Sequence, residues 1–140
     1  MQPVAVGIIM SNGHVLACQR KRTARYPLKW EFPGGKIEPN ESPWQALARE
    51  LREELGIEIS DGEEIHRQDW VYPDNPSGAD NDGSFRVHYF IIRTFTGEPA
   101  NFAFEQFRWV RPSELLTMDI LEGNRETVDL VVKHALAGRP

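Results

Sequence analysis

The 140-residue sequence predicts an α/β fold, a sandwich of helices on a central mixed β-sheet. Two observations carry this prediction. β-branched and aromatic segments form two groups, at residues 4–20 and 64–110, and an amphipathic helix at 42–55 separates them. A second helical pattern follows near the C-terminus. The length suits one hydrophobic core, so we expect residues 1–140 to form a single domain.

The first group of strands is predicted to be a hairpin. Residues 4–9 (VAVGII) are apolar and β-branched, residues 11–13 (SNG) form a turn, and residues 14–20 (HVLACQR) return as the second strand.

The helix at 42–55 has a start and a stop in the sequence. Ser42 is suited to cap it, Pro43 to its first position, and Gln45 completes a capping box. Gly56 supplies the C-terminal stop. Apolar residues recur at helical spacing to give a buried stripe: Trp44, Leu47, Ala48, Leu51 and Leu55.

The second half of the chain predicts two long strands, a short strand and a helix. Residues 64–73 and 84–95 are the long strands, and a loop rich in Pro, Gly, Asn and Asp joins them at 73–83. Residues 106–110 form the short strand and 112–116 a helical turn. The buried stripe of the C-terminal helix comprises Leu121, Val128, Val131, Val132, Ala135 and Leu136.

Composition excludes several classes of protein. A net charge of −5 argues against nonspecific binding to duplex nucleic acid. Cys18 is the only cysteine, which excludes an intrachain disulfide and a thiol-rich zinc site and favours a reducing, cytoplasmic location. No segment reaches the roughly 18 apolar residues of a membrane span, so we expect no membrane association.

Three glutamates stand close together on the central helix. Glu50, Glu53 and Glu54 are spaced i, i+3 and i+4, so they share one sector of the helix surface. Each like-charge pair there costs about 0.2–0.5 kcal/mol. One interpretation is a solvated face. The other is a site for a hard divalent cation, which an all-oxygen cluster suits, and the preceding Gly34–Gly35 turn favours it.

At these residues the chain resembles the Nudix hydrolases. Gly35, five residues, Glu41, seven residues and then residues 49–57 (RELREELGI) match every fixed position of the Nudix box. The segments EFPGGKIE, AVGIIMSNGHVLACQR and FRWVRPSELL resemble the MutT-like branch. The resemblance implies an α/β/α sandwich with a central mixed sheet, and hydrolysis of nucleoside diphosphate-linked compounds with Mg²⁺ or Mn²⁺ as cofactor.

The resemblance also implies roles for residues of the box. Glu50, Glu53 and Glu54 would bind metal together with the carbonyl of Gly34. Either Glu50 or Glu53 would orient or deprotonate the attacking water, and Arg49 would brace a glutamate of the box. Since a phosphate chain and a glutamate cluster repel each other, divalent ions between them are physically reasonable.

Further candidates lie outside the helix. Glu105 resembles a glutamate that many members use as an extra ligand or base; the alternative is an exposed loop charge. Arg20 occupies the place of an arginine that reaches the phosphates. Lys36 is a further substrate-binding candidate, although its GGK context lacks the spacing of a phosphate-binding P-loop.

Base recognition has two sets of candidates. Asn124 stands where related proteins specific for oxidised guanine nucleotides have a base-reading asparagine, and an amide both donates and accepts. Asn is also a favoured helix N-cap. Five aromatic residues on strands are either stacking surfaces for a base, Phe32 above all, or core: Phe32, Trp70, Tyr72, Phe85 and Tyr89.

We therefore expect a MutT-like nucleoside triphosphate pyrophosphohydrolase that releases a nucleoside monophosphate and pyrophosphate. The expected substrate is an oxidised guanine nucleotide or a pyrimidine triphosphate, because the chain shows no extra N-terminal domain of the kind found in sugar-nucleotide members. Two alternatives are a nucleotide-binding module without hydrolysis and an enzyme for another diphosphate such as ADP-ribose. We expect a monomer or weak homodimer.

Overall fold

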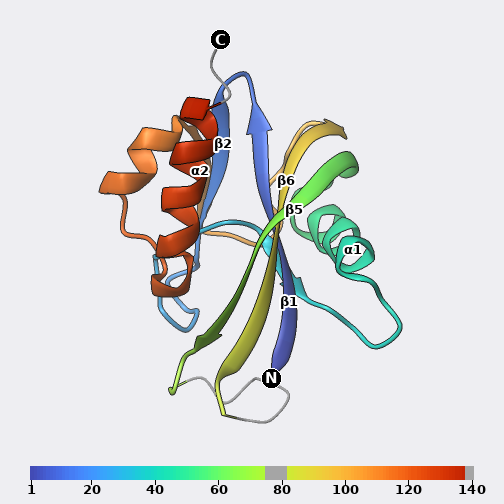
Figure 1. Cartoon of the computed structure of the whole chain (residues 1–140), viewed down its shortest axis with the longest axis vertical. Coiled ribbons are helices and arrows are strands. Elements are labelled where there is room, and N and C mark those ends of the chain that lie inside the picture. The colour runs from blue at the N-terminus through green and yellow to red at the C-terminus, as the bar shows by residue number, and fades with distance from the viewer. Residues whose placement is uncertain (75–81, 138–140) are drawn as a thin grey trace.

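A β-sheet lies between two helices in the computed structural model, which describes residues 1–74 and 82–137. Helix α1 (Pro43–Leu55) covers one face, and helix α2 (Arg125–Ala137) covers the other with the short 3₁₀ helices η1 (Pro112–Thr117) and η2 (Glu122–Asn124). Figure 1 shows these layers edge-on, with α1 and α2 on opposite sides. The predicted α/β sandwich is confirmed.

The sheet is mixed, and its first strand pairs with other strands along both edges. Strand β1 (Gln2–Ser11) pairs in parallel with β6 (Ser84–Thr96), which pairs antiparallel with β5 (Glu58–Val71). The other edge of β1 pairs with β4 (Gly34–Lys36) along one half and with β2 (His14–Gln19) along the other. Strand β2 then pairs with β3 (Trp30–Glu31) and β7 (Gln106–Val110).

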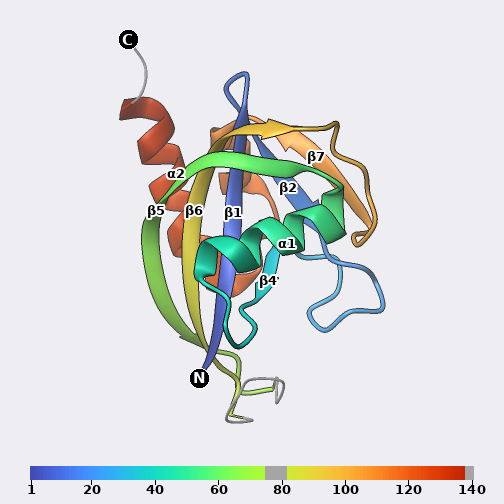
Figure 2. The ribbon, with the colours of Figure 1, turned by 90° about the vertical axis from the view of Figure 1, so that its right-hand side faces the viewer.

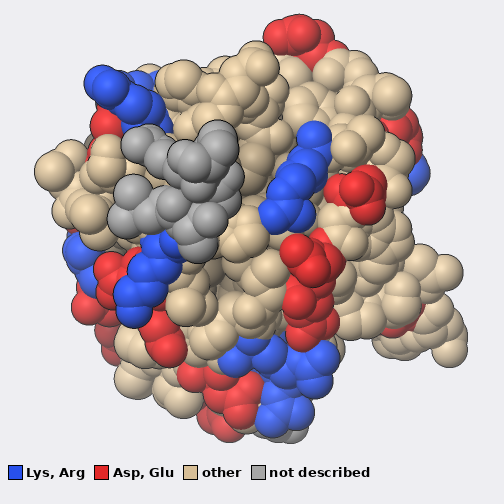
Figure 3. Space-filling model, turned by 45° about the horizontal axis from the view of Figure 1, so that its top comes forward, with Lys and Arg blue, Asp and Glu red and all other residues tan. Residues whose placement is uncertain are grey.

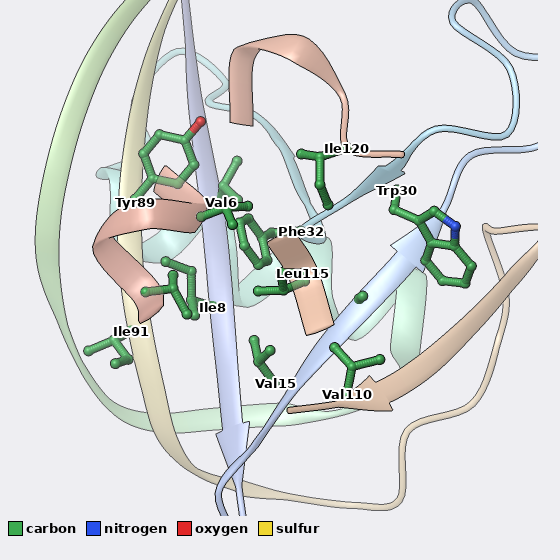
Figure 4. Close-up of a cluster of buried hydrophobic side chains, with 13 residues drawn as sticks. Val6, Ile8, Val15, Trp30, Phe32, Tyr89, Ile91, Val110, Leu115 and Ile120 are labelled. Atoms are coloured by element: carbon green, nitrogen blue, oxygen red, sulfur yellow. The ribbon is translucent and has the colours of Figure 1, made fainter. Parts of the chain in front are cut away.

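Strand β1 is apolar on both faces because each face meets a helix layer. Val6 and Ile8 join the core beneath α2, whereas Ala5 and Ile9 join the core beneath α1. A strand buried on both faces carries a continuous apolar run rather than an alternating pattern. Figure 4 shows the core on the α2 side, where Val6 lies close to Phe32.

Helix α1 forms as its sequence predicts. The Ser42 side chain accepts from the Gln45 backbone N–H at 3.1 Å, and Gln45 accepts from the Ser42 N–H at 2.9 Å. Gly56 ends the helix in a left-handed conformation. Leu47, Leu51 and Leu55 of the predicted stripe are buried against the sheet together with Ala46, whereas Trp44 and Ala48 are only partly buried. Figure 2 shows α1 lying across the sheet, with β4 beside it.

Two predicted elements differ from the structure. Strand β5 begins at Glu58 rather than at residue 64. The sequence pattern does not show its first part as a strand, because that part is polar and is broken by register shifts between residues 59 and 66. The segment predicted as a Gly34–Gly35 turn is instead strand β4, whose partners on β1 are Val6 and Ala5. Residues 75–81 of the predicted loop and the Leu136 side chain lie outside the described residues.

The surface and helices show two further features. On the face in Figure 3, acidic and basic side chains alternate with uncharged surface, and the described residues form no continuous basic stripe there. No helix within residues 1–74 and 82–137 is both long and apolar enough to cross a membrane.

Replacement of Ser42 by alanine removes one half of the capping box. We expect Ser42→Ala to lower the free energy of unfolding by about 1 kcal/mol, since a backbone N–H at the helix start loses its acceptor. Urea denaturation measures this. The matched control is Ser113→Ala at an exposed position, expected to change stability little. Equal effects of the two variants would contradict the capping role.

Candidate active site

The glutamates of α1 lie directly against the glycine backbone of β4. The Gly34 N–H donates to Glu54 Oε1 at 3.0 Å. The Glu50 carboxylate occupies the space beside Gly35, where a Cβ atom would collide with it. A Cβ on Gly34 would collide with the Ala5 carbonyl, and its φ of 151° also favours glycine. Both glycines are therefore required by close approach.

The three carboxylates of α1 differ in environment. The Glu53 side chain is 59% exposed, whereas that of Glu50 is 17% exposed. Burial and the nearby Glu50 raise the pKa of Glu54 to about 8, although the Gly34 N–H opposes this shift. Burial also raises the pKa of Glu50, against the effect of Arg49. The helix face predicted as one sector is thus divided into a partly buried pair, Glu50 and Glu54, and an exposed third member, Glu53.

Arg49 links the helix to the loop before it. Its Nε and Nη2 donate to the two Glu41 oxygens at 2.8 and 2.9 Å, and Nη1 donates to Glu50 at 3.0 Å. Nη2 also donates to the Lys36 carbonyl at 3.0 Å, and Nη1 lies 3.5 Å from Glu53. The hydrogen bonds from Arg49 lower the pKa of Glu41 to about 2. The predicted brace is present, and it holds Glu41 and Glu50 together.

The carboxylates do not converge into a finished ligand set. Within residues 1–74 and 82–137, no three His, Cys, Asp or Glu side chains are grouped closely enough to hold a metal ion as they stand. Like charges separate and take other partners, here Arg49 and the Gly34 N–H.

The donors nevertheless suit a hard divalent cation. The carboxylates of Glu50, Glu53 and Glu54 and the backbone of Gly34 are an all-oxygen set, as Mg²⁺ and Mn²⁺ prefer. Burial and the nearby Glu50 raise the pKa of the partly buried Glu54, and a bound cation would compensate its charge. These residues fit the cofactor that the sequence predicts.

A cleft of about 280 Å³ opens beside these residues. Gly34, Gly35 and Glu54 contribute to its lining, and so do all five aromatic residues singled out in the sequence: Phe32, Trp70, Tyr72, Phe85 and Tyr89. Phe32 is only 5% exposed and also belongs to the core, so the two readings of these aromatics are compatible. Its volume is large enough for the nucleoside part of a nucleotide but is below the usual volume of a pocket that encloses a whole ligand.

Arg20 lies on the wall of the same cleft, paired with an acid that sequence reasoning missed. Arg20 Nη1 donates to Glu31 Oε1 at 3.0 Å, and Arg20 Nε donates to the Arg25 carbonyl at 2.8 Å. Burial raises the pKa of Glu31, against the effect of Arg20. A carboxylate between the apolar Trp30 and Phe32 was the available signal in the sequence.

Tyr26 is the second cleft residue that sequence reasoning missed. It sits in the segment between β2 and β3 with a φ of 55°, uncommon for an aromatic residue, and its ring lies 5.0 Å from that of Tyr72. A single sequence shows no periodicity in this segment, so nothing indicated that Tyr26 reaches the cleft.

Asn124 lines the cleft and does not cap α2. It is the last residue of η2. Its Nδ2 donates to the Tyr89 hydroxyl at 3.0 Å, and its Oδ1 accepts from no helix N–H among the described residues. Only 7% of the residue is exposed. The N-cap interpretation is wrong for this side chain, and the cleft position leaves base reading as its candidate role.

Two candidates lie outside this cleft. Lys36 ends β4 with an exposed side chain and is not among the residues that line the cleft. Glu105 precedes β7, and its carboxylate accepts from the Arg22 N–H at 3.3 Å and lies 3.6 Å from the Arg22 guanidinium. The structure therefore joins Glu105 to the segment between β2 and β3, not to the glutamates of α1.

Known proteins are similar to this chain in sequence. The NUDIX domain model matches residues 1–131. CTP pyrophosphohydrolase of Escherichia coli (strain K12) is 44% identical over 86 residues, which cover 53% of this chain and 64% of that protein. The putative 8-oxo-dGTP diphosphatase 2 of Mycobacterium tuberculosis (strain ATCC 25618 / H37Rv) is 35% identical over 125 residues, which cover 89% of this chain and 83% of that protein.

Solved structures share the fold. The solution structure of the E. coli ORF135 protein matches with a TM-score of 0.82 and 31% identity, covering 100% of this chain and 94% of that one. A MutT structure from work on Aliivibrio salmonicida and Vibrio cholerae matches with a TM-score of 0.75 and 27% identity, covering 94% and 96%. The chain therefore belongs to the Nudix family, and its class is that of the Nudix pyrophosphohydrolases.

Replacement of Arg49 by lysine keeps the charge but removes the planar fork. We expect Arg49→Lys to lower the melting temperature by a few degrees, because one ammonium cannot replace the bonds to Glu41, Glu50 and the Lys36 carbonyl. The matched control is Arg52→Lys on the same helix, whose forked pair with Glu58 is exposed and contributes little. A larger effect of Arg52→Lys in thermal denaturation would refute the brace.

Proposed function

We propose that the protein is a Mg²⁺-dependent nucleoside triphosphate pyrophosphohydrolase that releases a nucleoside monophosphate and pyrophosphate. One observation supports this most: the aromatic cleft and the glutamate–glycine site are continuous, because Glu54, Gly34 and Gly35 line the cleft. A base held among the aromatic rings would place its phosphates toward α1. Neither part of the site alone would select a nucleotide.

The residues divide the chemistry among them. Glu50, Glu53 and Glu54 with the Gly34 carbonyl would hold the divalent ion, which neutralises phosphate charge and lowers the pKa of bound water. Glu53 is the most exposed of the three and would accept a proton from the attacking water, whereas a hydrogen bond from Arg49 and the close approach of Gly35 confine Glu50. Arg20 offers a cation on the cleft wall to a phosphate group.

The proposed substrate is an oxidised guanine nucleotide or a pyrimidine triphosphate. Relatives named for CTP and for 8-oxo-dGTP support these two choices. The cleft supports them too, since its aromatic walls suit stacking of a planar base and Asn124 offers an amide at its edge.

Incubation with a panel of nucleotides tests the function. The panel comprises 8-oxo-dGTP, dGTP, CTP, dCTP, dUTP and ADP-ribose, each with Mg²⁺ or with EDTA, and the products are resolved by ion-exchange chromatography. We expect monophosphate and pyrophosphate from at least one triphosphate, no turnover in EDTA and recovery when Mg²⁺ is restored. Turnover of ADP-ribose alone would replace the substrate assignment, and metal-independent turnover would overturn the mechanism.

Replacement of Glu53 by glutamine removes one carboxylate while preserving its shape. We expect Glu53→Gln to reduce kcat by at least about 100-fold with an unchanged melting temperature, because the side chain is exposed and its loss removes a proton acceptor. The matched control is Glu63→Gln, a similarly exposed glutamate on β5 that pairs with Arg93. Unchanged turnover of Glu53→Gln would return this residue to a solvated helix face.

A further inference from the structure

The Tyr89 hydroxyl lies within a buried hydrogen-bond chain beneath the cleft. Tyr89 is fully buried on β6. Its Oη lies 3.3 Å from the Gly123 carbonyl and 3.0 Å from Nδ2 of Asn124, both in η2. Figure 4 shows the hydroxyl pointing away from Ile8 and Ile91 in the aliphatic core. The Tyr89 hydroxyl thus hydrogen-bonds the short helix η2, which carries the candidate base-reading residue Asn124.

The chemistry of these groups fixes the direction of each hydrogen bond. A carbonyl oxygen only accepts, so Tyr89 donates its single proton to Gly123. Burial raises the pKa of Tyr89, and the hydroxyl therefore keeps that proton. Its oxygen is left to accept, and Asn124 must turn its amide nitrogen toward it. The buried Thr127 side chain also lies beside the Tyr89 hydroxyl and lowers the pKa of Tyr89, against the larger effect of burial.

The Gly123 carbonyl is itself held in place. The Gly123 N–H donates to the Tyr72 hydroxyl at 2.7 Å, and Gln68 Nε2 donates to the Gly123 carbonyl at 3.2 Å. A side chain on Gly123 would collide with the Tyr72 hydroxyl. The Tyr72 hydroxyl therefore holds the turn that carries this acceptor, and the bond from Gln68 adds to the stability of the turn.

One end of the Asn124 amide remains for a ligand. The bond to Tyr89 is the only hydrogen bond of this side chain within residues 1–74 and 82–137, so Oδ1 is uncommitted there. Asn124 lines the cleft. Although the amide nitrogen keeps a second N–H, its bond to Tyr89 fixes the amide plane and presents Oδ1 at a defined point, where an acceptor discriminates in favour of N–H groups.

We propose that Tyr89 is a positioning residue that sets the orientation of the Asn124 amide, so that the cleft prefers bases with an N–H donor at this point. Cytosine offers its 4-amino group where uracil has a carbonyl oxygen. 8-Oxoguanine has an N7–H where guanine has a bare N7. The inference rests on the proposed function and adds to it the residue that orients the candidate base-reading amide.

Competition between dCTP and dUTP tests the inference, because the two bases differ along one edge only: cytosine has a 4-amino donor and a bare N3, and uracil has a 4-carbonyl oxygen and an N3–H. We expect the wild-type protein to prefer dCTP by about tenfold or more in kcat/KM. Tyr89→Phe should reduce the preference at least about threefold through weaker use of dCTP, since the amide is free to turn. The pair 8-oxo-dGTP and dGTP should respond in the same direction.

The control variant separates orientation from stability. Gln68→Met removes a buried hydrogen bond to the same Gly123 carbonyl but leaves Tyr89 and Asn124 intact. It should lower the melting temperature and leave the dCTP to dUTP ratio unchanged. A fall in the ratio equal to that of Tyr89→Phe would show that any loosening of the turn suffices, and would overturn the inference.

A spectroscopic measurement makes the test independent of turnover. In a ¹H–¹⁵N spectrum of the ligand-free protein, one Asn124 side-chain amide proton should be protected from solvent exchange, and the protection should be lost in Tyr89→Phe. Unchanged protection, or a wild-type preference for dUTP and dGTP, would refute the inference. Absence of turnover on every nucleotide would instead refute the proposed function, and the exchange measurement would still decide whether Tyr89 orients the amide.

Discussion

The contact between α1 and the backbone of β4 is the constraint on which the rest of the site depends. Two glycines let the strand approach the helix so closely that Glu54 accepts from a β4 N–H and Glu50 fills the space of a missing side chain. The helix is held at this distance by its buried leucines and by its cap. Carboxylates are thereby fixed on a backbone that can itself supply oxygen ligands.

This contact concentrates negative charge where a folded protein normally avoids it. The raised pKa values of Glu50 and Glu54 measure the cost, since both carboxylates lose solvent and face one another. Arg49 offsets part of it by joining Glu50 to Glu41, but no basic group bonds Glu54 among the described residues. A site that remains short of positive charge is suited to recruit a cation, which is why the proposed function requires one.

Local elements followed from the sequence, and contacts between distant segments did not. The cap and stop of α1 are local patterns, and the spacing of its glutamates fixed which residues share a face. Gly34 and Gly35 were predicted as a turn because glycine freedom alone does not distinguish a turn from close strand packing. Asn124 is favoured as an N-cap by its neighbours in the chain, yet its partner Tyr89 is 35 residues away. The Arg20–Glu31 pair was missed for the same reason, since two segments must fold before the ions meet.

The two ends of the cleft therefore have different physical origins. The end at α1 is built from one continuous segment, residues 34–56, so its chemistry can be encoded by spacing within a single motif. The aromatic end is assembled from β5, β6 and η2, whose positions relative to one another depend on the whole sheet. Selectivity at that end depends on the orientation of one amide, which a buried hydroxyl on a neighbouring strand holds. Loss of this one hydroxyl group can thus alter which base is accepted, while the segment at α1 is left unchanged.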